Sequence, residues 1–240
     1  MSHRIVSKIM AQNKFVVDCI KARLKSCGFD VIDEFNTSWY NQIKPSQLRL
    51  SFPERRLALL IGNSKAIWPH FLEYYKFNKL VKDPFDTFVR ETIEDTFRKE
   101  TQDDEDKSLD YFYSHETAPD RLIAFQKLAS ICGTAYLDES IHLCVHQTFG
   151  AWFALRAVVI FNNIQCSTLD PPPPFVPVLD ALELEKARTS LALAVEARKS
   201  ADPSAARYWI EVRTSLSYGG EHRYDEQQLL YHYTKSRELL

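Results

Sequence analysis

The chain has 240 residues and a formal net charge of −2 at pH 7, from 30 lysines and arginines against 32 aspartates and glutamates. The basic residues are scattered rather than gathered in a stripe, which argues against a dedicated nucleic-acid-binding protein. No run of about 18 apolar residues occurs, so no membrane span is expected. The N-terminal apolar residues are spaced, unlike those of an export signal, and the cytoplasm is the predicted location. The five cysteines are dispersed without a C-x-x-C motif, which predicts reduced thiols and no zinc site.

The spacing of apolar residues predicts most of the secondary structure. Helices are expected over residues 3–26, 66–80, 83–99, 119–136, 180–199 and 225–240, with another, capped by Asp202-Pro203, that carries Tyr208, Trp209 and Arg213. Strands are expected over residues 30–40 with a turn at 38–41, over 48–52 paired with 57–61, and over 109–113. Ser64 is the expected N-cap of the second helix, and Pro84 suits the first turn of the third. The acidic run 101–106 is expected to be a solvated loop.

The most β-rich stretch, residues 141–161, combines Val, Ile, Leu and aromatic residues with Gly150 near its middle. This composition predicts one or two central strands that bend near residues 148–150. Arg156 lies in this stretch, and a buried guanidinium needs either a carboxylate partner or an anionic ligand. Cys144 and His146 lie two residues apart on one face of a strand. We interpret them as an inert buried thiol and a histidine hydrogen-bonded to a carbonyl rather than as direct participants in chemistry.

Strands clustered in the middle of the chain, with helices before, between and after them, predict an α+β fold. The proline run 171–174 predicts a stiff connector, and therefore a boundary between residues 1–170 and a helical region over residues 171–240. The motifs G-x-G-x-x-G, P-loop, H-E-x-x-H and G-x-S-x-G are absent. A dinucleotide site, an NTP site, a zinc protease and an α/β-hydrolase therefore have no support in the sequence.

Three places, in this order, resemble the cblC-type family of cobalamin-processing proteins (methylmalonic aciduria and homocystinuria type C). Residues 28–31, GFDV, and 38–41, SWYN, are similar to the family's G-F-(D/E)-V start and its A-W-Y-N motif. Residues 83–86, DPFD, are similar to its D-P-V-D. The most specific match is CVHQTFGAWFALR over residues 144–156, which resembles C-I-H-P-R-F-G-G-W-F-A-I-R. The resemblance spans roughly residues 15–240.

The resemblance implies a nitroreductase- or flavin-reductase-like α+β fold with a central, mostly antiparallel sheet flanked by helices. It implies an enzyme that binds methyl-, adenosyl- and cyanocobalamin with the lower base displaced from cobalt. Alkyl upper ligands would leave by transfer to glutathione and cyanide by reduction, with FMN or FAD as a candidate electron donor. Residues 1–170 would be the cobalamin-binding core and residues 171–240 a helical cap that completes the site. The product would pass to a downstream trafficking protein, and the enzyme would be a monomer or a ligand-dependent homodimer.

The resemblance also implies site residues. Glutathione would be bound by Arg156, Arg213 and Arg237, since planar guanidinium groups suit its two carboxylates. The candidate cobalamin-binding positions are Ser130, Tyr136, Cys144, His146, Phe149, Gly150, Trp152 and Trp209. No protein metal ligand is expected, because the corrin holds the cobalt. Trp39 is a further candidate for the wall of the pocket, although each aromatic residue taken alone is expected in the core rather than in the wall. The chain departs from the family pattern at Ser130, Gln147, Thr148, Ala151 and Ala157.

Two other functions stay open. A flavin-dependent reductase would use a similar cleft for the flat ring of FMN, and a yellow purified protein would indicate it. A non-catalytic cobalamin chaperone would bind its cargo base-off without glutathione-dependent turnover.

Overall fold

The computed structural model describes residues 3–48, 51–101, 109–167 and 169–240. The chain divides into two compact units, each built from two separate segments. Unit 1 is Met1–Ile123 with Leu155–Asp170, and unit 2 is Ala124–Ala154 with Pro171–Leu240. In the part of the chain that is described, no helix combines the length and apolar character needed to cross a bilayer.

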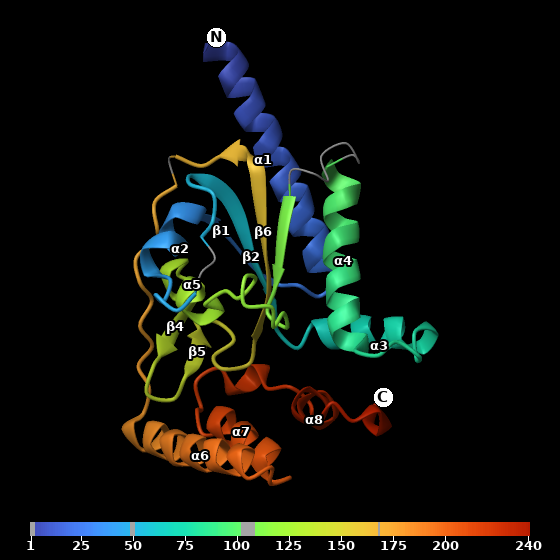
Figure 1. Ribbon diagram of the computed structural model, residues 1–240, viewed down its shortest axis with the longest axis vertical. Coiled ribbons are helices and arrows are strands. Elements are labelled where there is room, and N and C mark those ends of the chain that lie inside the picture. The colour runs from blue at the N-terminus through green and yellow to red at the C-terminus, as the bar shows by residue number, and fades with distance from the viewer. Residues whose placement is uncertain (1–2, 49–50, 102–108, 168) are drawn as a thin grey trace. The chain divides into compact units, whose positions relative to one another are not determined.

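The centre of unit 1 is a four-stranded sheet in the order β1-β2-β6-β3 (Figure 1). The strands are β1 (Val31–Asn36), β2 (Arg56–Asn63), β3 (Leu109–Tyr113) and β6 (Ala154–Gln165). β1 is antiparallel to β2, and β3 is antiparallel to β6 with Tyr113 opposite Ala157. Nearly all of β2 and the middle of β6 are buried. These unbroken apolar runs therefore form the two inner strands.

The helices described in unit 1 precede and connect these strands. They are α1 (His3–Ser26), α2 (Thr37–Ile43), α3 (Ile67–Phe77) and α4 (Pro84–Thr101). α1 and α4 pack against each other (Figure 1). Phe71 of α3 meets Phe85 of α4 edge-on, with ring centroids 4.8 Å apart. This contact fixes the start of α4, where Pro84 is the first helical residue because a missing N–H costs nothing there.

Unit 2 holds a two-stranded antiparallel sheet and a group of helices. Its elements are α5 (Phe125–Ile131), β4 (Ala135–Asp138), β5 (Leu143–His146), α6 (Ala181–Lys199), α7 (Ala205–Thr214), η2 (Gly220–His222), α8 (Glu226–Thr234) and η3 (Arg237–Leu239). α6 and α7 lie side by side (Figure 1), and they bury Ala187 and Val212 together with Val145 of β5. Asp180 caps α6, because its side chain accepts two backbone N–H groups of the first turn.

The expected α+β class, with an antiparallel sheet flanked by helices, is confirmed. The bend expected near residues 148–150 is also found, because β5 ends at His146 and β6 begins at Ala154. β5 belongs to the small sheet of unit 2, however, and only β6 is central to the larger sheet. Unit 2 resumes at Pro171, where a boundary was expected, but residues 124–154 group with it as well. The division into a core over residues 1–170 and a cap over residues 171–240 stays a prediction.

Three expectations in the N-terminal half are wrong. Residues 38–41 are helical in α2, because the Asn36 side chain accepts the Ser38 N–H and caps the helix. β2 pairs with β1, while Leu48 and Phe52 lie outside any strand; residues 49 and 50 lie outside the described part of the chain. Ser64 is not the N-cap of α3, since its hydroxyl donates to Asp30 and the helix begins at Ile67. The acidic run over residues 102–106 also lies outside the described residues.

Two expected helices are shorter than the sequence suggested. α5 ends at Ile131, because Gly133 adopts the left-handed conformation with φ of 68° and the chain then enters β4. α8 ends at Thr234, because Lys235 is also left-handed, with φ of 56°. Asp202 is not the N-cap of α7; that position is Ser204, whose backbone N–H donates to the Asp202 side chain.

Candidate functional site

The turn after β5 carries several predicted cobalamin-binding positions and is closed by two backbone hydrogen bonds. His146 N–H donates to the Gly150 carbonyl at 2.8 Å, and Gly150 N–H donates to the His146 carbonyl at 2.9 Å. The imidazole folds back over the turn, where its Nδ1 accepts the backbone N–H groups of Thr148 at 3.0 Å and Phe149 at 3.2 Å. Because Nδ1 is an acceptor, the neutral ring carries its hydrogen on Nε2. His146 therefore holds the turn through backbone amides, a role that the sequence did not predict.

Four rings gather at this turn. Phe149 stacks on His146 with centroids 4.8 Å apart and meets His222 edge-on at 5.1 Å. Phe153 lies 5.4 Å from the His146 ring. We call His146, Phe149, Phe153 and His222 the aromatic group. Flat aromatic rings suit the face of a planar ligand.

Gly150 is locked against a second glycine turn within unit 2. It has φ of 55°, and a Cβ atom at this position would collide with the carbonyl oxygen of Tyr218. A Cβ atom on Gly219, where φ is 72°, would stand 2.5 Å from the Gly150 nitrogen. The Tyr218 hydroxyl then donates to the Gln147 carbonyl at 2.8 Å. Only glycine combines this left-handed backbone with so close an approach, so the lock sets the position of the whole turn.

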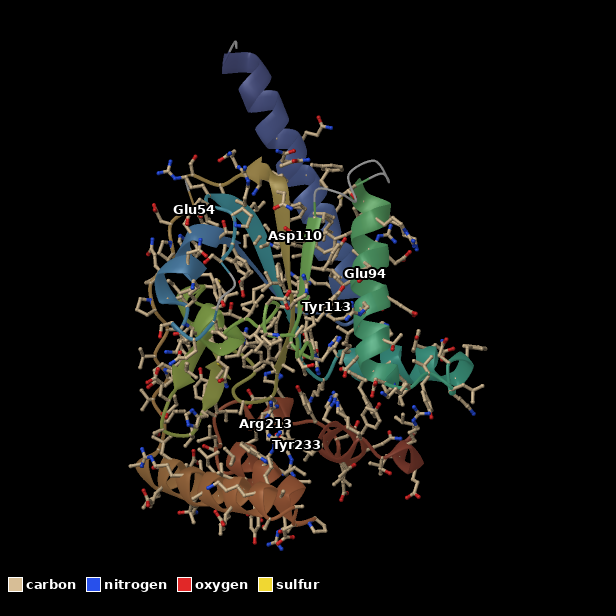
Figure 2. The ribbon with its side chains drawn as sticks, in the orientation of Figure 1. Glu54, Glu94, Asp110, Tyr113, Arg213 and Tyr233 are labelled. Carbon is tan, nitrogen blue, oxygen red and sulfur yellow. The ribbon has the colours of Figure 1, made fainter. Side chains whose placement is uncertain are left out.

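Arg213 provides the positive charge of the candidate site in unit 2. Its Nη1 donates to the Phe153 carbonyl at 3.4 Å, and its guanidinium lies 6.0 Å from the centre of the Tyr233 ring (Figure 2). Burial alone would lower the pKa of Arg213, but Tyr233, Tyr224 and Cys144 outweigh it, so the pKa is raised. Among the described residues no carboxylate pairs with this guanidinium. An anionic ligand would complete such an arrangement.

Cys144 lies on β5 and is 6% exposed. Its thiol is within 3.8 Å of the Gln126 carbonyl oxygen, to which it donates. Burial raises the pKa of Cys144 to about 12, and the charge of Arg213 offsets this only in part. The group is therefore a neutral thiol at pH 7 and a poor nucleophile. The expected burial is confirmed, while its assignment to a cobalamin site stays a prediction.

Trp152 is 1% exposed and packs with Tyr224 and Leu229 in a small cluster. Its ring meets Tyr224 edge-on at 5.7 Å. The indole N–H is buried with no hydrogen-bond partner among the described residues, which costs on the order of 1–3 kcal/mol. Trp209 packs separately, against the core beside Val212.

Arg156 belongs to unit 1, at the start of β6. Its Nε–H donates to Oδ1 of Asn63 at 2.6 Å, and its guanidinium lies 4.7 Å from the centre of the Phe85 ring. Asn63 is fully buried at the end of β2, and its own Nδ2 donates to the Ser64 carbonyl at 2.8 Å. The amide orients the guanidinium without neutralising its charge. Such an orientation favours recognition of an anion.

The predicted site residues are divided between the units. Arg156 and Trp39 are in unit 1, whereas Arg213, Arg237 and the other cobalamin-binding candidates are in unit 2. Within unit 2 the structure brings Cys144 close to Arg213 and groups Phe149 with His146. Ser130 is exposed on α5, Tyr136 is half-buried on β4, Arg237 is exposed in η3, and Trp39 in unit 1 is buried in α2.

Five residues that surround these candidates in unit 2 were not predicted as site residues: Phe153, Tyr218, Tyr224, His222 and Tyr233. The turn at residues 218–220 and the pair Arg223-Tyr224 were visible as local features. Nothing local indicated that they would meet the turn after β5, because more than 60 residues separate the two segments.

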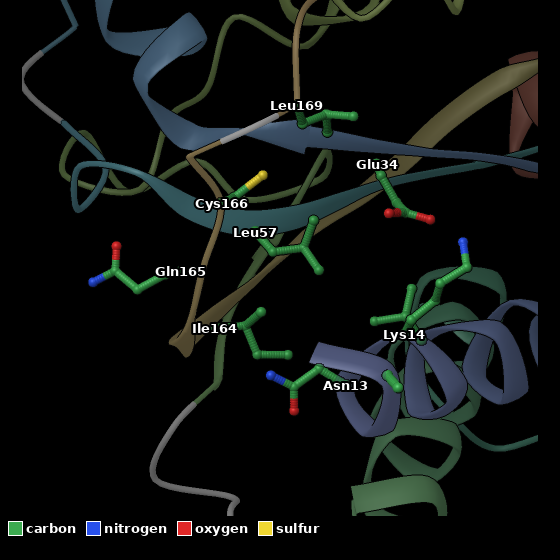
Figure 3. A pocket seen from close by; sticks show the side chains of 10 residues that line it. Asn13, Lys14, Glu34, Leu57, Ile164, Gln165, Cys166 and Leu169 are labelled. Atoms are coloured by element: carbon green, nitrogen blue, oxygen red, sulfur yellow. The ribbon is translucent and has the colours of Figure 1, made fainter. Parts of the chain in front are cut away.

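A separate cavity of about 410 Å³ lies in unit 1, beside α1 and the end of β6 (Figure 3). It is lined by Ala11, Asn13, Lys14, Val17, Glu34, Leu57, Ile164, Gln165, Cys166 and Leu169. Lys14 and Glu34 point toward each other (Figure 3), and the ion pair of Glu34 is with Lys21 at 2.8 Å. None of the predicted site residues lines this cavity.

Residues 28–193 match the model of the methylmalonic aciduria and homocystinuria type C family. The chain belongs to this family. The matched segment includes the three motif regions and Arg156, and it ends before Arg213. The type C family assignment thus agrees with the resemblance seen in the sequence.

Named relatives of this type C family chain include the cyanocobalamin reductase / alkylcobalamin dealkylase of Gallus gallus. That protein is 25% identical over 197 residues, which cover 73% of this chain and 78% of the relative. The protein of the same name from Mus musculus is 30% identical over 171 residues, which cover 62% of this chain and 59% of the relative. The match therefore spans about three-fifths of the mouse protein.

A solved structure shares the fold. The crystal structure of the C. elegans B12-trafficking protein CblC, a human MMACHC homologue, superposes with a TM-score of 0.62. The match covers 93% of this chain and 92% of that one at 18% identity. At this level of identity the likeness establishes the fold alone.

Proposed function

We propose that this protein processes cobalamin. It binds cob(III)alamins with the lower base displaced from cobalt and removes the upper ligand. Alkyl groups leave by transfer to glutathione, and cyanide leaves by reduction. The names of the chicken and mouse relatives support both activities. The proposed location is the cytoplasm, the proposed assembly is a monomer or ligand-dependent homodimer, and the product passes to a downstream trafficking protein.

The observation that carries the glutathione part of the proposal is the Arg213 guanidinium, which lies among phenols and a thiol without an acidic partner. Glutathione brings two carboxylates, and one of them would supply the missing negative charge. A charge-assisted hydrogen bond of this kind contributes roughly 1.5–3 kcal/mol. Arg156 and Arg237 remain proposed as further glutathione-binding residues.

In the dealkylation, the glutathione thiolate attacks the alkyl carbon bound to cobalt. The carbon–sulfur bond forms as the cobalt–carbon bond breaks, and both electrons of the broken bond stay on cobalt. The products are cob(I)alamin and a thioether, and the thiol proton is released. Guanidinium charge near the thiol lowers its pKa and so raises the thiolate fraction. The protein supplies binding and orientation, while cobalt carries the bond chemistry.

The aromatic group and Gly150 are proposed to receive the cobalamin, with Ser130, Tyr136, Cys144, Trp152 and Trp209 kept as further candidates. Cys144 is not proposed as a nucleophile, because its thiol stays neutral. Decyanation needs electrons from outside the chain, and FMN or FAD is the proposed donor. A nitroreductase-like fold is part of the same proposal.

An anaerobic absorbance titration with methylcobalamin, followed by glutathione, tests the function. The expected result is a shift to the base-off spectrum on binding, then the cob(I)alamin spectrum after glutathione is added. A base-off shift without turnover would identify a cobalamin chaperone instead. No shift, together with a yellow protein that reduces free flavin, would favour the flavin-dependent reductase.

A further inference from the structure

A histidine and an arginine outside the predicted site form a compact group on the edge of unit 1 that carries Arg156. Nη2 of Arg90, on α4, lies 3.3 Å from Nε2 of His115, just after β3. The Arg90 guanidinium also lies 4.4 Å from the centre of the Tyr113 ring, and that ring stacks on His115 at 5.4 Å. Nδ1 of His115 faces Oδ1 of Asp86 at 3.9 Å. Two packed rings thus hold one guanidinium in a defined place.

Arg156 adjoins this group through the sheet and through α4. The Ser114 N–H donates to the Arg156 carbonyl at 2.8 Å, next to His115 in the chain. The Arg156 guanidinium lies over Phe85, the residue before Asp86. The positive charge of Arg156 is close enough to act on the His115 imidazole. Arg90, His115 and Arg156 therefore share one region within unit 1.

The negative charge opposite Arg90 is weak for so ordered a guanidinium. Glu94 lies 4.0 Å from Arg90, at the limit of an ion pair, and both side chains are nearly half exposed. The same Glu94 oxygen accepts the Tyr113 hydroxyl at 3.0 Å (Figure 2). Exposed pairs of this kind contribute about 0–1 kcal/mol. The geometry therefore orders Arg90 without satisfying its charge.

The charged and titratable groups that face His115 are Asp86 and Arg90 on α4, Glu116 beside it, Tyr113 on β3 and Arg156 on β6. Burial is the largest effect and lowers the pKa of His115 below its ordinary value of 6.5. Asp86 and Glu116 raise it, while Arg90 and Arg156 lower it further. His115 is therefore neutral at pH 7, and its Nε2 accepts from Arg90.

We infer that Arg90, His115 and Arg156 form a carboxylate-binding subsite for the thiol substrate, and that His115 takes up a proton when the carboxylate binds. This inference rests on the proposed function, because glutathione supplies the carboxylate. A carboxylate beside the two guanidinium groups offsets the positive charges that help to keep His115 neutral. Its own negative charge favours the protonated imidazole. Protonated His115 then donates to the carboxylate from Nε2 while Nδ1 faces Asp86.

Binding of the carboxylate favours protonation of His115, and protonation of His115 favours binding of the carboxylate by the same factor. This linkage fixes the direction in which the affinity changes with pH. The ligand-bound pKa of His115 is higher than the ligand-free pKa. The part of the affinity for the carboxylate that protonated His115 contributes is fully present below the ligand-free pKa of His115. It is lost as the pH rises through the ligand-bound pKa of His115. A rise of about one pKa unit corresponds to a tenfold change in affinity.

The test is isothermal titration calorimetry of the full chain with S-methylglutathione, with and without one equivalent of cyanocobalamin. This probe keeps both carboxylates but has no thiol, so thiol ionisation adds nothing to the proton count. Titrations near neutral pH in two buffers of different ionisation enthalpy give the number of protons taken up. We expect fractional proton uptake in the wild type, and affinity that falls about three- to tenfold from about pH 6 to about pH 8.

Two variants and their controls show which residues cause the proton uptake and the binding of S-methylglutathione. His115→Gln should abolish proton uptake and flatten the pH dependence, whereas His70→Gln, at an exposed position on α3, should change neither. Arg90→Gln should weaken binding about tenfold, in keeping with the loss of a charged hydrogen bond. Arg98→Gln, on an exposed face of the same helix, should bind normally.

Should His115→Gln fail to fold, the NMR titration of the His115 imidazole in the wild type gives the same information, since its pKa should rise when S-methylglutathione is added. Binding without proton uptake, or uptake that persists in His115→Gln, would overturn the subsite and leave the proposed function intact. If neither S-methylglutathione nor glutathione bound and no dealkylation occurred, the glutathione-dependent function itself would fall, and the subsite with it.

Discussion

Gly150 and Gly219 approach each other so closely that a Cβ atom on Gly219 would stand 2.5 Å from the backbone nitrogen of Gly150. Both residues have positive φ, and they belong to turns far apart in the chain. The pair joins the turn after β5 to the segment before η2. Any side chain at either position must push these two backbones apart.

Gly150→Ala should therefore destabilise the protein. The left-handed backbone costs an Ala residue about 1–2 kcal/mol, and the clash with the Tyr218 carbonyl adds to it. We expect a loss of about 2 kcal/mol or more in the free energy of unfolding, measured by urea denaturation. Gly220→Ala is the matched control, because a Cβ atom there would meet no heavy atom within 4 Å. Equal stability of the two variants would contradict the lock.

Replacement of Arg213 separates glutathione use from cobalamin binding. Arg213→Gln should raise the KM for glutathione at least about tenfold, because the carboxylate loses a charged partner. The base-off spectral shift with methylcobalamin should remain. Arg207→Gln, on the same helix but exposed and paired with Glu211, is the control and should behave as the wild type. Unchanged glutathione kinetics in Arg213→Gln would remove this arginine from the site.

A carboxylate within the protein can be made to compete with glutathione for Arg156. In Asn63→Asp, a carboxylate replaces the amide oxygen that accepts the Arg156 Nε–H at 2.6 Å. The internal ion pair should weaken glutathione binding about tenfold while Arg156 stays in place.

Arg156→Ala should abolish glutathione-driven dealkylation and spare cobalamin binding. Initial rates over a range of glutathione concentrations test both variants, and normal dealkylation in Arg156→Ala would show that the arginine has no such role.

Cys144 should be nearly inert toward thiol reagents in the folded protein. With its pKa raised to about 12 by burial, the thiolate fraction at about pH 8 is far below that of an ordinary cysteine. Mass spectrometry after iodoacetamide treatment should show modification at least about a hundredfold slower than in the urea-unfolded chain. The half-buried Cys19 and Cys27 provide the internal comparison. Rapid labelling of native Cys144 would mean that the thiolate is accessible.

The regular elements could be predicted from sequence where pattern and local chemistry agree. α6 has an N-capping Asp180, and α4 has Pro84 in its first turn, so both were predicted within a few residues. α2 was missed, because its formation depends on the Asn36 side chain, which caps it in a stretch that otherwise alternates. The partner of β2 was also missed, since strand pairing depends on contacts across the sheet that no local pattern encodes.

The candidate site was predictable only in part for the same reason. The sequence identified Arg156 as a charge needing a partner, and one partner is Asn63, which lies 93 residues away. Arg213 was proposed from the resemblance, while the tyrosines around it depend on how α7 and α8 pack. Arg90 and His115 were not singled out from the sequence. Their relation appears only when β3 and α4 are placed together.

The alternation of the chain between units has a consequence for synthesis on the ribosome. Unit 1 needs β6, which pairs with β3, so its sheet stays incomplete until residues 154–165 have left the exit tunnel. By then the hairpin of β4 and β5 has emerged, but α6 and α7, which bury Val145, have not. The apolar side chains of the hairpin therefore stay exposed to solvent until α6 and α7 have been synthesised and pack against them. A nascent chain of which only the residues up to Pro171 have left the exit tunnel would therefore leave Val145 uncovered, whereas the complete chain buries it.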